Sequence, residues 1–302
     1  MSFGKYDKDS RGGRRMTGAD RTISSGRKKF KTLRYVQILL CSVVAATCIL
    51  PLVWLMDFSL VKSNELFTDK FLVWPGHPYW KNYQLALTSG KVPQYLLNSI
   101  IVAIVSVVLI VVLSLMMSYG FSRMKWKYSK IVLNIVLLGF MIPIHATLLS
   151  NFITFSDMHI QDSYFAIIIP YVAFNLPQAT FIMTGFMNTV PDAVEESALM
   201  DGCSIFRLLF QIVLPVLKPA VMTVVITAFI NVWNEFIMAA TFLTSDTFRT
   251  LPFSVYNFSG MYSSNYSAQF AVMTLTALPS LIVYIFLNKH ITKGIAAGAV
   301  KG

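Results

Sequence analysis

The chain has 302 residues, of which 55% are hydrophobic and only 13% are charged, with a net charge of +11. A soluble domain carries about a quarter charged residues. The composition therefore argues against a soluble enzyme or a disordered chain, and three cysteines are too few for a disulfide scaffold. Runs without any charged residue occupy 35–56, 92–122, 131–156, 163–191, 219–234 and 250–288. Five of these six runs exceed the roughly 20 apolar residues that cross a bilayer, which indicates an integral membrane protein.

The first segment, 1–34, is polar and holds eleven Lys and Arg residues. Its Gly, Ser, Arg and Lys content predicts a disordered tail up to about Arg27. About 34 polar residues before the first apolar run do not fit a secretory signal peptide. A basic tail of this kind suits contact with anionic membrane lipid. Nucleic-acid binding is the alternative, which we do not favour.

Six transmembrane helices are predicted, because a lipid-exposed strand would leave backbone groups unpaired and the sequence shows no alternating barrel pattern. We place them at 36–57, 95–121, 131–155, 164–186, 217–243 and 269–288. The second is almost continuous Ile, Val and Leu, which predicts a lipid-exposed helix. The predicted organisation is all-α, with a basic tail at 1–34, a first helix at 35–57, a loop at 58–94, a transmembrane domain at 95–288 and a tail at 289–302.

The loop at 58–94 is rich in aromatic and proline residues, namely Phe71, Trp74, Pro75, Pro78, Tyr79, Trp80 and Tyr83. Amphipathic aromatic side chains suit the headgroup layer of a membrane. This composition favours an interfacial segment that anchors the fold. A docking surface for a partner outside the cell is the alternative.

The positions of the basic residues predict the orientation of the chain. With six crossings, 20 of the 25 Lys and Arg residues fall on the side that holds both termini. Cytoplasmic loops carry such an excess of positive charge. We therefore expect a multi-pass protein of the cell's inner (plasma) membrane, with both termini in the cytoplasm and the loop 58–94 outside.

A hydrophilic segment, 188–215, lies on the predicted cytoplasmic side. Thr189 followed by Asp192 resembles a capping box, so a short helix should begin here. Gly202 can take the left-handed conformation that ends a helix, and a second helix should follow until Pro215 turns the chain. The segment is either a solvated acidic loop or a docking knob for a cytoplasmic protein, since it holds acids at 192, 195, 196 and 201.

The same segment carries a family motif. Glu196-Ser197-Ala198, then Gly202, then Ile212-x-Leu214-Pro215 resemble the Glu-Ala-Ala, Gly, Ile-x-Leu-Pro motif of permease subunits in ATP-binding-cassette (ABC) importers. Within that family, Trp233-Asn234-Glu235-Phe236 and the terminal Gly294-x-x-x-Gly298-x-x-Lys301-Gly302 resemble the carbohydrate-uptake branch and its maltose-type second permease. Ser197 departs from the usual Ala, but a small residue is kept, so helix packing should survive.

This resemblance implies a type I ABC importer permease fold, with six transmembrane helices. It also implies that 189–203 is a coupling helix, seated in a groove of a separate ATPase subunit. Acidic residues of the segment would meet complementary groups there, and apolar residues would fill the groove. The predicted ATPase-coupling residues are Glu195, Glu196, Ser197, Ala198, Leu199, Met200, Asp201, Gly202, Leu214 and Pro215.

The resemblance further implies several partners. These are a second homologous permease, two ABC ATPase subunits and an extracellular sugar-binding protein that delivers the sugar substrate. The ATPase subunits would use ATP and Mg²⁺, since this chain has no G-x-x-x-x-G-K-[ST] run. We expect no cofactor, metal or catalytic residue on this chain, because its four histidines share no ligand spacing.

Spans three to five could hold the substrate path, because their prolines and polar side chains persist in a membrane only against protein or a wet cavity. Asn231, Asn234 and Glu235 share one helical face by their spacing. Counted from Lys218, Glu235 lies about 26 Å along its helix, near the outer end. Two roles are open for it: structural or gating hydrogen bonds, and the lining of a sugar cavity. The predicted path residues are Asn175, Gln178, Trp233, Asn234 and Glu235.

An ion-coupled secondary transporter is the alternative function. Such a protein is expected to carry inverted repeats and buried acids near the middle of the membrane, and neither is clear in this sequence. A membrane enzyme is a third class, which the sequence does not favour because no nucleophile and base pattern occurs.

Overall fold

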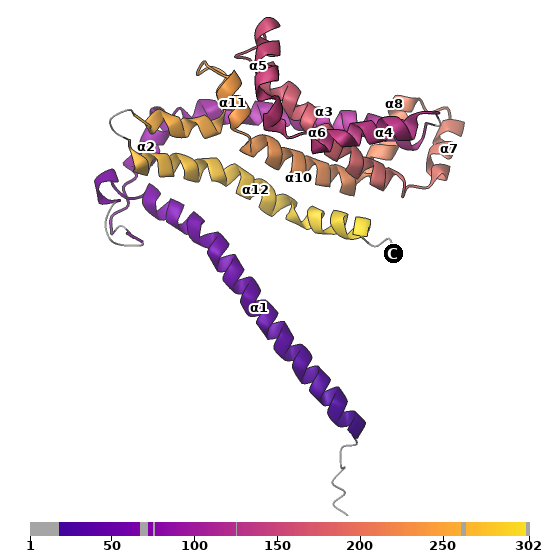
Figure 1. Ribbon diagram of the computed structural model, residues 1–302, viewed down its shortest axis with the longest axis horizontal. Coiled ribbons are helices and arrows are strands. Elements are labelled where there is room, and N and C mark those ends of the chain that lie inside the picture. Colours follow the sequence, from indigo (N-terminus) through magenta and orange to yellow (C-terminus); the bar gives the residue numbers. More distant parts are fainter. Residues whose placement is uncertain (1–17, 67–71, 75, 125, 261–263, 300–302) are drawn as a thin grey trace, which may run out of the picture. The chain divides into compact units, whose positions relative to one another are not determined.

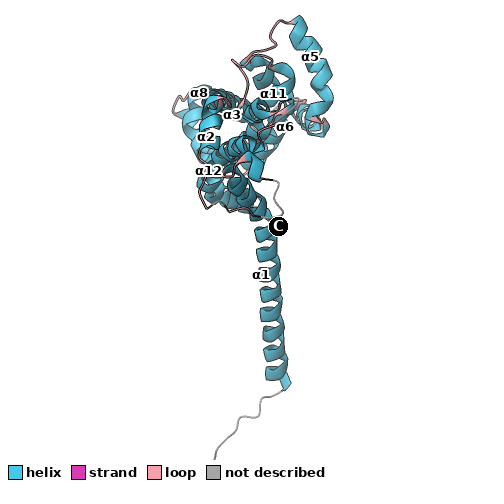
Figure 2. Cartoon of the chain, turned by 90° about the vertical axis from the view of Figure 1, so that its left-hand side faces the viewer, coloured by secondary structure: helices cyan, strands magenta, loops and turns pink. Residues whose placement is uncertain are grey.

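The computed structural model describes residues 18–66, 72–74, 76–124, 126–260 and 264–299 of the chain. Within these residues the structure is helical (Figures 1 and 2), and its β-type pairing is limited to an isolated antiparallel bridge between Ser259 and Ser264. The chain divides into two compact units, 1–54 and 55–302, which are described separately. The predicted all-α class is confirmed.

The described part of the first unit belongs to α1 (Gly18–Ser59). The stretch 34–59 of this helix is long and apolar enough to cross a membrane. The helix begins at Gly18 and so includes 18–27 of the basic tail, while 1–17 lie outside the described residues. The disorder of this tail stays a prediction. Arg and Lys favour helix almost as well as the best helix formers, so the helix can continue through the basic stretch. The one proline inside α1 is Pro51, which lies beyond that stretch.

Four long helices pack together in the second unit: α3 (Val92–Ser122), α6 (Tyr164–Met187), α10 (Lys218–Asn234) and α12 (Tyr266–Ala299). α3 contacts α6 and α10, and α10 also contacts α6 and α12, so these helices lie side by side (Figure 1). Their shared core is apolar and includes the buried Val102, Ile110, Ile167 and Val224. The predicted tail 289–302 is helical as far as the structure describes it, since α12 continues to Ala299.

The prediction that α3 is lipid-exposed is wrong for one of its faces. Ser106, Ser114 and Ser118 are buried, and the hydroxyl of Ser118 donates a hydrogen bond to the carbonyl of Thr180 on α6 at 3.2 Å. Small residues allow two helices in a membrane to approach closely. The long apolar run therefore conceals a packing face that is marked by serines.

The third predicted span is broken. It consists of α4 (Ser129–Leu138) and α5 (Leu148–Asp157), joined through η2 (Gly139–Met141) and η3 (Ile144–Thr147), and its two parts meet at 90°. The break lies at Ile142 and Pro143, both of which are extended. A proline disfavours helical backbone at the preceding residue and cannot donate a backbone hydrogen bond. As a result, α5 points away from α3 and α6 (Figure 2).

The fifth predicted span, 217–243, is also broken. α10 ends at Asn234, Glu235 is extended, and α11 (Ile237–Phe242) follows. At its other end, α10 meets the helical stretch 205–216 at an angle of 85°. In the described residues, four helices are long and apolar enough to cross a membrane, and there are six spans if each bent pair counts as one.

The predicted loop 58–94 contains η1 (Ser63–Glu65) and α2 (Lys81–Thr88), and η5 (Leu251–Phe258) lies in a later connection. α2 and η5 both pack against α3 and α12. The buried carboxylate of Asp57 accepts hydrogen bonds from the amides of Val73 and Trp74, each at 2.9 Å. The Trp74 side chain is exposed, and its role at a membrane surface stays a prediction.

Candidate functional site

The short helix predicted after Thr189 is α7 (Asp192–Met200). It ends as predicted, because Gly202 has a φ of +77°, a conformation that glycine adopts without a side-chain penalty. The predicted capping box does not form. The hydroxyl of Thr189 donates to the carbonyl of Phe186 at 2.8 Å, and Asp192 pairs with Arg123 instead.

After this turn, three short stretches lead to α10: α8 (Ile205–Arg207), η4 (Leu208–Val213) and α9 (Leu214–Val216). η4 is a π-helix, and Pro215 follows it in the first turn of α9. A proline that cannot donate a backbone hydrogen bond suits such a locally widened helix. The chain turns at Leu217, just before α10 begins, so the predicted turn at Pro215 is two residues early.

α7 has one face turned to the rest of the chain and one face exposed. Glu195 and Ala198 are buried, and Ala198 belongs to an apolar cluster with Leu115, Met187 and Leu208. Glu195 and Ala198 are therefore in contact with other parts of this chain, and their contact with a partner subunit stays a prediction. Leu214 is half-buried, and the exposed predicted residues are Glu196, Ser197, Leu199, Met200, Asp201, Gly202 and Pro215.

Arg123, the residue directly after α3, holds the inward face of α7. Its Nε lies 2.8 Å from Oε1 of Glu195, and its Nη1 lies 2.8 Å from Oδ1 of Asp192. Its Nη2 donates to the carbonyls of Met187 and Val190 at 3.0 and 2.7 Å. The side chains of Arg123 and Glu195 are only 13% and 6% exposed. Three guanidinium nitrogens thus bind four acceptors at the junction of α3, α6 and α7.

A pocket of about 400 Å³ lies between α6, α10 and the break in the third span. Phe140 and Phe174 are among its apolar lining residues. Its polar lining consists of His145, Tyr171, Asn175, Asn231, Asn234 and Glu235. The structure therefore brings together three of the five predicted path residues, Asn175, Asn234 and Glu235. The amide of Asn231 joins this group by donating to Oδ1 of Asn175 at 2.9 Å.

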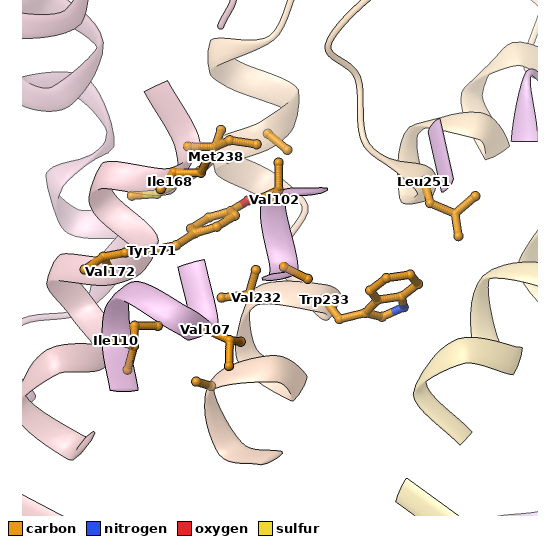
Figure 3. Close-up of a cluster of buried hydrophobic side chains, with 14 of the residues drawn as sticks. Val102, Val107, Ile110, Ile168, Tyr171, Val172, Val232, Trp233, Met238 and Leu251 are labelled. Carbon is orange, nitrogen blue, oxygen red and sulfur yellow. The ribbon is translucent and has the colours of Figure 1, made fainter. Parts of the chain in front are cut away.

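Glu235 fills the break between α10 and α11. Its Oε1 accepts from the amide of Met238 at 2.9 Å, and its Oε2 accepts from the amide of Ala239 at 3.4 Å. A carboxylate at these amides caps the start of α11. The hydroxyl of Tyr171 donates to Oε2 at 2.5 Å, and Figure 3 shows the Tyr171 ring beside Met238. Glu235 has a structural role and also borders the pocket.

Trp233 and Gln178 are predicted path residues that do not line the pocket. Trp233 is buried, its ring stacks on Phe229, and its Nε1 donates to the carbonyl of Thr276 on α12 at 3.4 Å. Figure 3 shows it pointing away from Tyr171. The reason is helical geometry, because a residue two positions after Asn231 faces another side of the helix. Gln178 lies about one turn beyond Asn175 on α6.

Sequence reasoning missed Arg123, His145 and Tyr171 as site residues. The charge count assigns Arg123 only to one side of the membrane. Its place directly after the uncharged run 92–122 is a signal that could have marked it as a site residue. His145 reaches the pocket because the third span breaks at Pro143, whereas Tyr171 lies on α6, one turn before Asn175. Within the part of the chain that the structure describes, no three His, Cys, Asp or Glu side chains come together as metal ligands would.

Comparisons with known proteins give a consistent result. Residues 110–297 match the family model described as the binding-protein-dependent transport system inner membrane component. The ABC transporter permease protein ORF2 of Caldicellulosiruptor sp. is 40% identical over 252 residues, which cover 83% of this chain and 91% of that protein. The sulfoquinovosyl glycerol transport system permease protein SmoH of Agrobacterium fabrum is 27% identical, covering 92% and 98%.

A solved structure shares the fold. It is that of a bacterial ABC transporter involved in the import of the acidic polysaccharide alginate. One of its chains matches with a TM-score of 0.73 and 18% sequence identity, covering 91% of this chain and 98% of that chain. At this identity the likeness concerns the arrangement of the helices, including those that carry α7 and the pocket.

Proposed function

This chain belongs to the family of binding-protein-dependent transport system inner membrane components, and we propose that it moves a sugar or oligosaccharide by alternating access in an ATP-driven importer. It is a multi-pass membrane protein with the type I ABC importer permease fold. The names of the relatives support a carbohydrate substrate, because they refer to a glycoside and a polysaccharide. The chain itself would be a non-catalytic subunit.

The proposed assembly contains a second homologous permease, two ABC ATPase subunits and an external sugar-binding protein. The ATPase subunits would bind ATP and Mg²⁺ and supply the energy. The distribution of the basic residues supports an orientation in the plasma membrane with α7 and both termini in the cytoplasm. In this orientation the pocket lies toward the outer side of α10.

The proposal that an ATPase subunit docks on this chain rests on the exposed face of α7. The Leu199 and Met200 side chains are 50% and 88% exposed, although the other face of the same short helix is firmly held. Exposed apolar side chains on a segment outside the predicted spans suit the groove of a soluble partner. Glu196 and Asp201 beside them would meet basic or polar groups of the ATPase subunit.

A double substitution tests this docking surface. Leu199→Ala with Met200→Ala should lower sugar uptake about tenfold or more and release the ATPase subunit from the purified complex, since buried apolar anchors dominate interface affinity. Met158→Ala is a matched control, because this exposed methionine lies outside α7. Unchanged uptake and unchanged ATPase binding would contradict the proposal. Uptake that persists after ATP depletion with an ion gradient intact would favour a secondary transporter.

We also propose that the pocket contacts the sugar during transport. Its amides can match sugar hydroxyls, and its Phe140 and Phe174 rings offer flat apolar surfaces. The side chain of Asn234 is exposed and donates to the carbonyl of Ile230, so its Oδ1 is the group to offer a sugar hydroxyl.

Replacement of Asn234 tests the sugar contact. Asn234→Leu should raise the KM for uptake about fivefold, the value of one hydrogen bond, while the ATPase subunit stays bound. The control is Asn134→Leu, because Asn134 is an exposed asparagine of α4 that does not line the pocket. Equal uptake kinetics in the two variants would remove this pocket from the path.

A further inference from the structure

Arg123 stands where three helix ends meet. It follows the last residue of α3, and its Nη2 binds the carbonyls of Met187 and Val190, at and just beyond the end of α6. Its other nitrogens bind Asp192 and Glu195 in the first turn of α7. A cation is favoured at a helix C-terminus and carboxylates are favoured at a helix N-terminus. All three helix dipoles therefore stabilise this arrangement.

The contacts of Arg123 divide the acids in and just after α7 into two groups. Asp192 and Glu195 both bind Arg123; the Glu195 side chain is 6% exposed, whereas the Asp192 side chain is 72% exposed. Glu196 and Asp201 are exposed and do not bind Arg123. The family motif begins at Glu196, so the residue just before the motif is buried and binds Arg123, whereas the motif acid is exposed.

We propose that Arg123 is the positioning residue that locks α7 to α3 and α6, so that a movement of the docked ATPase passes into both membrane helices at once. This inference rests on the proposed function. A helix tied at a single point would pivot on the ATPase, whereas a guanidinium that binds four acceptors, with Glu195 buried among them, makes α7 move together with the ends of α3 and α6. The sugar-transporting movement is then coupled to ATP hydrolysis through this contact.

The shape of the guanidinium should matter as well as its charge. Arginine presents its donors in a fixed planar fork, whereas lysine offers a single ammonium group on a flexible stem. One ammonium cannot reach the two carboxylates and the two carbonyls in the geometry that Arg123 uses. Arg123→Lys keeps the positive charge but removes the planar fork of donors. It therefore separates a requirement for positive charge from a requirement for the four hydrogen-bonded contacts.

The experiment uses the assembled complex in liposomes, with the cognate binding protein, second permease and ATPase subunits. In Arg123→Lys we expect the ATPase subunit to remain bound and the number of sugars imported per ATP to fall about tenfold. Amide hydrogen exchange over 192–201 should rise about tenfold, because α7 opens more easily. Arg207→Lys is the matched control, since the side chain of this exposed arginine bonds only to Gln211 in the described contacts.

Several outcomes would overturn this inference. Wild-type sugar yield per ATP in Arg123→Lys, or unchanged exchange over 192–201, would show that α7 is positioned by other contacts. If the variant fails to accumulate, Asp192→Asn with Glu195→Gln removes both opposing charges while keeping Arg123, and unchanged exchange there would also overturn the lock. A wild-type complex that neither binds the ATPase nor imports sugar would instead refute the proposed function.

Discussion

The two ends of α3 are each attached to another segment by a charged cluster, but the clusters differ in burial. At the start of α3, Asp246 accepts hydrogen bonds from Lys91 at 2.5 Å, Tyr95 at 2.7 Å and Arg249 at 2.7 Å, and its side chain is 43% exposed. At the end of α3, Arg123 is 13% exposed. One cluster gathers donors around an exposed acid, and the other gathers acceptors around a buried cation.

This difference in burial predicts where each end derives its stability. Exposed ion pairs contribute little, whereas removing one partner of a buried pair leaves an uncompensated charge. The start of α3 is also held by uncharged contacts. Asn98, which is buried, donates to the carbonyls of Thr247 and Arg249 at 2.9 and 2.8 Å. We infer that the buried ion pair of Arg123 stabilises the end of α3 next to α7. Hydrogen bonds from the buried Asn98 amide stabilise the start of α3.

The largest effect is expected from Glu195→Ala at the α7 end. It should lower the free energy of unfolding by about 3 kcal/mol, because Arg123 would stay buried without the buried acid that it pairs with. Glu196→Ala, one residue later and exposed, should change it by less than about 0.5 kcal/mol. Thermal unfolding of the purified permease in detergent measures both variants. Equal losses would contradict the assignment of the two acids to different faces.

Smaller losses of stability are expected at the start of α3, and Asn98→Ala should cost more than Asp246→Asn. Asn98→Ala should cost about 2 kcal/mol, since it leaves buried carbonyls unsatisfied. Asp246→Asn should lower the melting temperature by only about 2 °C. If Asp246→Asn proves the more damaging of the two, charge holds this end as well, and the contrast between the ends of α3 disappears.

The same exposed cluster predicts a dependence on pH. The hydrogen bonds from Lys91 and then Tyr95 lower the pKa of Asp246 from 3.8 to about 2. Because the pKa is lower in the folded state, the carboxylate stabilises the fold above pH 4, and this contribution is lost as the pH falls toward 2. The Asp246→Asn variant should therefore lack this part of the acid sensitivity, which unfolding scans at pH 6 and pH 3 would reveal.

Local signals in the sequence predicted much of the local structure around the candidate site. Gly202 ends α7, and the acidic segment forms a helix–turn–helix connection. Asn234 and Glu235 line one pocket together with Asn175. These predictions succeeded because they depend on turn chemistry and helical spacing, which act over a few residues.

The features that the sequence did not reveal depend on contacts between distant segments. Glu195 and Glu196 look equivalent in the sequence, and only the approach of Arg123, from 72 residues earlier, separates them. Trp233 resembles a sugar-stacking residue until its bond to α12 is seen. A proline such as Pro143 is visible in the sequence, but the 90° turn of the third span depends on where the following helix packs.

The sequence by itself determined that this is a helical membrane protein with a motif-bearing segment between its fourth and fifth spans, because hydrophobic length, charge bias and turn residues are local properties. The tertiary structure alone decided which acids of α7 face outward, which polar residues share a pocket, and where two spans break. Those outcomes depend on burial and on the satisfaction of polar groups by distant partners, and neither can be counted along a chain.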